Sequence, residues 1–129
     1  MAKRVHGWLV AYWVLFCAFL GTAALNMLHV RGGFFTNYAA DIVVPAWLYI
    51  SWRGLPWSPH LKPRYPWLGA TPERTAALVF GASTLTELCQ RYWPRGFFPG
   101  HYDPLDIAAF AAGVGVCYVF DRLGRARTN

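Results

Sequence analysis

The sequence contains few charged residues, and this shortage is its most informative feature. Only 14% of its 129 residues are Asp, Glu, Lys or Arg, whereas soluble domains carry about 25%. Hydrophobic residues make up 56% of the chain, and 18% of the chain is aromatic. A single domain with this composition is typical of a small integral membrane protein.

Several common kinds of site are also missing. Cys17, Cys89 and Cys117 form no C-x-x-C pair, and each lies in an apolar segment, so neither a disulfide framework nor a zinc site is indicated. No HExxH-type metal motif occurs, and no motif singles out a catalytic nucleophile. The net charge of +6 comes from basic residues that flank apolar segments, which does not predict nucleic-acid binding. We therefore expect no metal, no cofactor and no nucleic-acid partner, and a non-catalytic role is favoured over an enzymatic one.

Four apolar segments are long enough to cross a membrane. At 1.5 Å per residue each spans roughly 30 Å, which matches the hydrocarbon core. The last two begin with a capping residue followed by proline, Thr71-Pro72 and Asp103-Pro104, and Gly124 is placed as a C-terminal cap. The sequence therefore predicts one all-α domain over residues 1–129, a bundle of four transmembrane helices joined in the middle by a Pro- and Trp-rich loop at 53–71. The predicted helices are 7–28, 35–52, 72–92 and 104–123.

The basic residues predict the orientation of this bundle. Four crossings place both termini and the 53–71 loop on one side of the membrane. Nine of the twelve Lys and Arg residues then lie on that side, and Arg31, Arg91 and Arg95 lie on the other. By the positive-inside rule, both termini are predicted to be cytoplasmic.

The polar residues within the four segments are predicted to gather at their outer ends. Asn26 and His29 end the first segment and Asp41 begins the second, whereas the inner halves contain almost no polar residues. Ionisable residues inside a membrane are candidates for function. We therefore predict an outward-facing polar pocket, closed over by residues 95–101. Its candidate ligand-binding residues are Asp41, Glu87, Gln90, Arg91, Arg95 and Asp106.

Simpler explanations exist for some of these charges. Glu87 and Arg91 are four residues apart on a helix and can pair with each other. Asp103 and Asp106 stand at the N-cap and N3 positions, where acids complement the helix dipole without any ligand. If the pocket is functional, its arginines suit an anionic lipid headgroup or another amphiphile, with the acids orienting them. The alternatives are a small accessory subunit of a larger membrane protein complex and an enzyme that acts on envelope lipid.

The stretch from Glu87 to Gly113 resembles the VanZ-like family of small bacterial membrane proteins. Glu87-x-x-Gln90, Arg95, Asp106 and Gly113 match the Glu-x-x-Gln, Arg, Asp and Gly of the family pattern. The chain departs from that pattern at Phe110, where the family usually has Asn. The resemblance implies a multi-pass protein of the bacterial inner membrane and cell envelope, with membrane lipids as partners. One member type of the family is linked to resistance to the lipophilic glycopeptide teicoplanin.

Overall fold

Four α-helices account for most of the chain in the computed structural model, which describes residues 2–29, 33–53, 66–97 and 100–126. They are α1 (Ala2–Met27), α2 (Phe34–Arg53), α3 (Pro72–Tyr92) and α4 (Pro104–Ala126). No strand occurs within those described ranges. The prediction of an all-α fold with four helices is confirmed. Most of the predicted 53–71 loop, residues 54–65, lies outside the described residues.

Two of the three helix ends that the sequence predicts from capping residues agree with the structure. Thr71 Oγ1 accepts a hydrogen bond from the backbone N–H of Arg74 (3.1 Å), and Asp103 Oδ1 accepts one from the N–H of Leu105 (2.9 Å). Both are N-cap bonds. The prediction that Gly124 ends the last helix is wrong, because α4 continues to Ala126. A glycine within a helix costs only about 1 kcal/mol, which the flanking turns tolerate.

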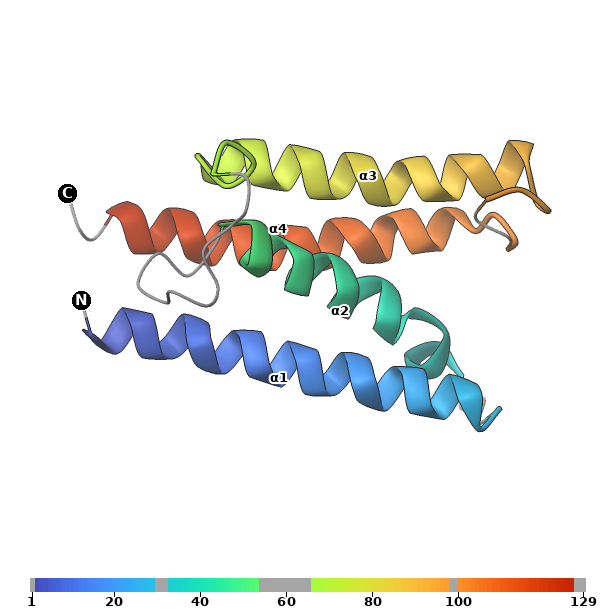
Figure 1. The fold of residues 1–129 in the computed structure, drawn as a ribbon, viewed down its shortest axis with the longest axis horizontal. Helices are drawn as coiled ribbons and strands as arrows, with labels where there is room; N and C mark the ends of the chain where they lie inside the picture. The colour runs from blue at the N-terminus through green and yellow to red at the C-terminus, as the bar shows by residue number, and fades with distance from the viewer. Residues whose placement is uncertain (1, 30–32, 54–65, 98–99, 127–129) are drawn as a thin grey trace.

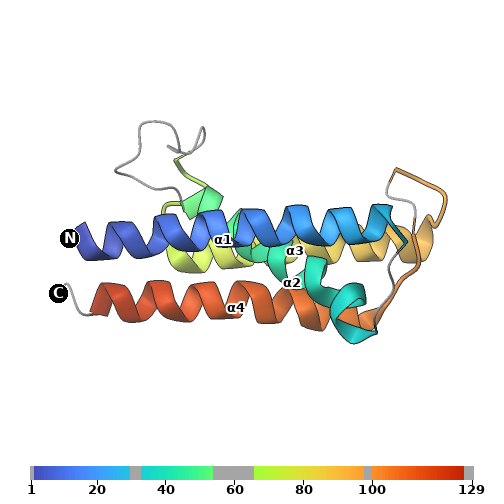
Figure 2. The ribbon, with the colours of Figure 1, turned by 90° about the horizontal axis from the view of Figure 1, so that it is seen from below.

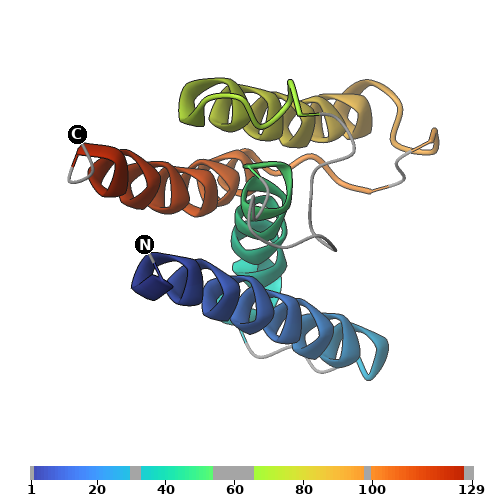
Figure 3. The ribbon, with the colours of Figure 1, turned by 60° about the vertical axis from the view of Figure 1, so that its left-hand side comes forward.

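The helices alternate in direction, so the start of α1 and the end of α4 lie at the same end of the molecule (Figure 1). We call this the terminal end, and we call the opposite end, where α3 connects to α4, the far end. Helices α2, α3 and α4 pack against one another, and α2 and α4 run in the same direction. Helix α1 packs on α2 alone, since no described Cα atom of α1 lies within 8 Å of one in α3 or α4. The fold is therefore a three-helix core with α1 attached to one side, as Figure 3 shows.

Glycine allows α2 and α4 to approach closely. A Cβ atom built on Gly113 would lie 2.2 Å from the backbone oxygen of Ile42, a distance that no larger residue can accept. Below this contact, Cys117 Sγ lies 3.8 Å from the backbone oxygen of Ala46. The buried core continues from here through residues of α2, α3 and α4. Its members are Ala46, Tyr49, Ile50, Val79, Val114 and Cys117.

Aromatic side chains attach α1 to α2. The rings of Tyr12, Phe16 and Phe19 lie one after another along α1, with centroids 5.8, 5.9 and 6.3 Å from that of Trp47. Their spacing of four and then three residues places them on one face of the helix. Each such ring pair contributes about 0.5–1.5 kcal/mol beyond the area that it buries.

Two of the helices are long and apolar enough to cross a membrane by length and composition. They cover His6–Met27 in α1 and Pro104–Gly124 in α4. Helices α2 and α3 do not reach the same hydropathy within the residues that the structure describes. The physical reason lies in their polar residues, which include Asp41 in α2 and both Glu73 and Glu87 in α3.

Candidate functional site

Four of the six acidic residues lie together at the far end, and we call this group the acidic cluster: Asp41, Glu87, Asp103 and Asp106. Asp41 stands in the second turn of α2, and Asp106 stands in the first turn of α4. Their carboxyl groups lie close enough to interact directly. Two residues separated by 65 positions thus meet in one site.

Asp103 connects all three core helices. Its backbone N–H donates to Glu87 Oε2 (3.3 Å) in α3, and its Oδ2 accepts a hydrogen bond from the Tyr38 hydroxyl (2.8 Å) in α2. Its Oδ1 caps α4 through the N–H of Leu105. One carboxylate oxygen of Asp103 therefore caps α4, and the other binds Tyr38 within the acidic cluster. Glu87 is only 4% exposed, so its charge is well removed from solvent.

Gln90 lies beside the acidic cluster, one turn after Glu87. With its amide nitrogen facing these acceptors, Gln90 donates to the backbone oxygen of His101 (3.2 Å) and to Glu87 Oε1 (3.3 Å). A Cβ atom on Gly100 would lie 2.9 Å from the Gln90 amide, so glycine lets the connection between α3 and α4 cover this side chain. Gln90 therefore holds both Glu87 and the covering segment in position.

The two arginines of the predicted pocket lie outside this group. The Arg91 guanidinium lies over the Tyr102 ring, 5.1 Å from its centroid, and the Arg91 side chain is exposed. Arg95 is exposed as well. The pairing of Glu87 with Arg91 that their spacing allows is not formed. The structure thus brings Asp41, Glu87, Gln90 and Asp106 together and leaves Arg91 and Arg95 at the rim.

Within the part of the chain that the structure describes, no Lys or Arg forms an ion pair with any of the four carboxyl groups of the acidic cluster. Buried charge that lacks a partner is costly. The site can therefore take up protons, or it can bind a cation or another strong hydrogen-bond donor. The described side chains include no group of three or more His, Cys, Asp or Glu placed to hold a metal ion.

Helix α1 contributes nothing to the acidic cluster. Asn26 and His29 at its far end are exposed, and α1 contacts neither α3 nor α4 in the described residues. Asn26 and His29 stand at the same end of the molecule as the acidic cluster without being part of it. The aromatic face of α1 binds it to α2, which keeps it away from the other two helices.

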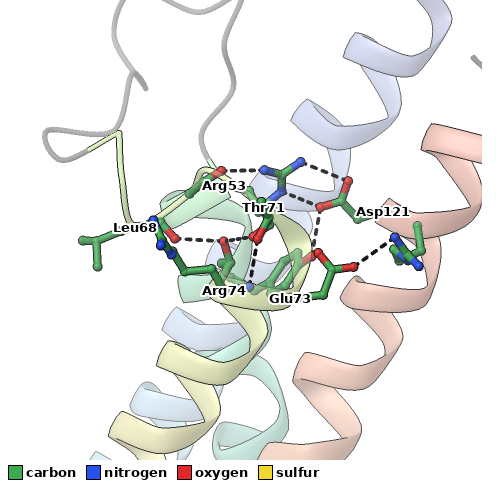
Figure 4. Close-up of polar contacts among 10 residues, drawn as sticks. Arg53, Leu68, Thr71, Glu73, Arg74 and Asp121 are labelled. Atoms are coloured by element: carbon green, nitrogen blue, oxygen red, sulfur yellow. Dashed lines mark hydrogen bonds and ion pairs between the residues drawn. The ribbon is translucent and has the colours of Figure 1, made fainter.

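A second polar group at the terminal end contradicts the prediction that the inner halves are almost free of polar residues. Asp121 in α4 is 3% exposed. Its Oδ2 accepts from Arg53 Nε (2.5 Å) and from the Tyr49 hydroxyl (2.9 Å), and its Oδ1 accepts from Arg53 Nη2 (3.3 Å). Arg53 Nη1 also donates to the backbone oxygen of Gly69 (2.5 Å). Figure 4 shows these contacts, which connect α2 and α4 to the start of α3.

The remaining acid is paired too. Glu73 forms an ion pair with Arg122 (3.0 Å), and both side chains are about half exposed. Both acids at the terminal end therefore have an arginine partner, whereas the four at the far end have none in the described residues. This contrast makes the acidic cluster the candidate functional site and the terminal-end group a structural one. Tyr38 was not among the candidate ligand-binding residues, yet its hydroxyl donates to Asp103 in the acidic cluster, and it stands one turn before Asp41 on the same helix face.

Comparison of the chain with models of known protein families, with curated proteins and with solved structures gave no significant match.

Proposed function

We propose that this chain is a multi-pass envelope protein of the bacterial inner membrane, similar to the VanZ-like family, whose acidic cluster binds the cationic part of a lipid headgroup or another amphiphile. The observation that carries this proposal is that four carboxyl groups lie near one another at the far end and that none of them forms an ion pair with a described Lys or Arg. Near a membrane the local dielectric is low, so an ammonium group would be attracted strongly to such a site. The role is binding, not catalysis.

The packing of the helices supports membrane insertion of the whole core. Helix α4 is apolar enough to cross by itself, and α2 and α3 pack directly against it. With 20 and 21 residues, these two helices are also about 30 Å long. The basic residues concentrate toward the terminal end, which supports a cytoplasmic position for both termini. The acidic cluster then faces the outside.

The arginines at the rim suggest that the bound headgroup also carries a phosphate. Arg91 and Arg95 are exposed at the same end as the acidic cluster. A zwitterionic headgroup can place its ammonium among the carboxylates and its phosphate near these guanidinium groups, which bind phosphate in a bidentate manner. We therefore expect a preference for an amine-bearing phospholipid over one with a hydroxylated headgroup.

Lysolipid binding tests this function. Protein purified in mild detergent is titrated with lysophosphatidylethanolamine or lysophosphatidylglycerol, and bound lipid is measured by native mass spectrometry. Combined Asp41→Asn and Asp106→Asn substitution removes the charge with little change in shape, and we expect affinity for the amine lipid to fall at least tenfold, because a charged hydrogen bond contributes about 1.5–3 kcal/mol.

The matched control is Glu73→Gln, which removes an exposed acid at the opposite end. It should bind the amine lipid like the wild type. Equal affinity for the two lysolipids in the wild-type protein, or unchanged binding by the double variant, contradicts the proposed function. Helical content of each variant is checked by circular dichroism so that unfolding is not mistaken for lost binding.

A further inference from the structure

A long apolar cleft lies between α1 and α4, with α2 as its floor. Its volume is about 880 Å³, within the range of ligand-binding pockets. It exists because both outer helices pack on α2 but not on each other in the described residues. Figure 2 shows α1 and α4 as separate helices, and Figure 3 shows α2 lying between them. Small residues open its walls: Gly7 and Ala11 in α1, and Ala112 and Gly113 in α4.

The cleft is apolar throughout its described lining and occupies the half of the molecule nearest the terminal end. On α4 it extends from Ala112 to Gly124, which is about 18 Å at 1.5 Å per residue. One leaflet of a bilayer contributes roughly half of the 30 Å hydrocarbon core, or about 15 Å. The length and depth of the cleft therefore match the acyl region of the cytoplasmic leaflet, given the membrane orientation proposed above.

The charge at the mouth of the cleft favours an anionic lipid. The first turn of α1 carries Lys3 and Arg4 and no acid, and the positive end of the helix dipole adds to their charge. The described acids at this end, Asp121 and Glu73, are already paired with arginines. A phosphate at the cytoplasmic surface would thus lie near the positive end of α1 and the two basic residues of its first turn.

We propose that this cleft binds one acyl chain of an anionic phospholipid from the cytoplasmic leaflet, with its phosphate at the start of α1. This site is separate from the acidic cluster, which lies at the opposite end and is proposed to take an amine.

Two valines of α4 provide a matched test. Val116 lines the cleft and is 58% exposed, whereas Val119 lies outside the lining and is 51% exposed. Each is replaced by tryptophan, and the protein is extracted in mild detergent and incubated with phosphatidylglycerol or phosphatidylcholine. Native mass spectrometry then reports the number of phospholipids retained per chain. Because both positions are exposed, neither substitution disturbs the core.

We expect the wild-type protein and Val119→Trp to retain one phospholipid and to prefer phosphatidylglycerol, and Val116→Trp to lower retention about tenfold. Combined Lys3→Gln and Arg4→Gln should remove the preference for phosphatidylglycerol and leave one lipid bound. Equal retention by Val116→Trp and the wild type overturns the proposal, as does a lipid-free wild-type protein. A lipid-free dimer would show that a second copy covers the cleft instead.

Failure of this proposal is distinguishable from failure of the proposed function. The Asp41→Asn and Asp106→Asn variant should keep its anionic phospholipid, since its changes lie at the far end. Conversely, Val116→Trp should bind lysophosphatidylethanolamine like the wild type. If either variant lost binding of both the anionic phospholipid and lysophosphatidylethanolamine, the two sites would not be separate, and the cleft would be part of the amine site.

Discussion

Replacing Gly113 with alanine tests how closely α2 and α4 are packed. A Cβ atom at this position would lie 2.2 Å from the Ile42 oxygen and 3.1 Å from its carbonyl carbon. Since Cβ atoms do not come closer than 3.0 Å to other heavy atoms, α4 would have to move by at least about 0.8 Å. The obstacle is backbone, which cannot turn aside as a side chain can. Overpacking of this kind costs about 1–3 kcal/mol.

The matched control is Gly115→Ala. No heavy atom lies within 4 Å of a Cβ at Gly115, so alanine there should stabilise the helix by about 0.5–1 kcal/mol. The gain in helix propensity is common to both variants. The difference between their unfolding free energies therefore isolates the contact between Gly113 and Ile42, and we expect it to be about 1–3 kcal/mol.

Unfolding of the two variants in mixed micelles with increasing denaturing detergent, followed by circular dichroism, provides the measurement. Gly113→Ala should unfold at a lower fraction of denaturing detergent than Gly115→Ala. If the two variants unfold together, or if Gly113→Ala is the more stable, then α2 and α4 are not packed as closely as the structure places them. The meeting of Asp41 with Asp106 would then lose its support as well.

The remaining predictions concern the terminal end and α1. Asp121→Ala should lower the unfolding free energy by about 3 kcal/mol or more, because it leaves the mostly buried Arg53 without its carboxylate partner and with only the Gly69 oxygen. Glu73→Ala at the exposed ion pair should change the unfolding free energy by less than about 1 kcal/mol, and equal effects of the two substitutions in detergent unfolding would contradict this. Trp47→Ala should cost about 3 kcal/mol and release α1, which hydrogen exchange would detect as lost protection in residues 8–20 with α4 unchanged. Unaltered protection of α1 would refute the anchoring role of Trp47.

The helices were predictable from the sequence because their signals are local. Apolar length, proline at the first helical position and the capping groups of Thr71 and Asp103 all act within a few residues of one another. The same holds for the acidic cluster, since Asp41, Glu87 and Asp106 each stand near the far end of a predicted helix. Sequence reasoning could place these three at one depth without knowing which helices touch.

What the sequence did not predict depends on which helix faces which. Asp121 and Arg53 are 68 residues apart, and Arg53 was counted among the charges that flank a membrane segment, so nothing local indicated their pairing. The separation of α1 from α3 and α4 could not be predicted from the sequence either, because the length and hydrophobicity of a segment do not determine which helices it packs against. Arg91 lies over Tyr102 rather than beside Glu87, a choice between two nearby partners that helical spacing cannot decide.

The parallel pairing of α2 with α4 has a consequence for the order in which the protein is made. The polar partners of α2 are synthesised late: Asp103 follows Tyr38 by 65 residues, and Asp121 follows Tyr49 by 72. At about 5–20 residues per second, a ribosome needs several seconds to reach them. During that interval α2 emerges with its acid and arginine unmatched, and only α1 is present beside it. The aromatic contacts of Trp47 with α1 can therefore form first and stabilise α2 before α4 has been synthesised.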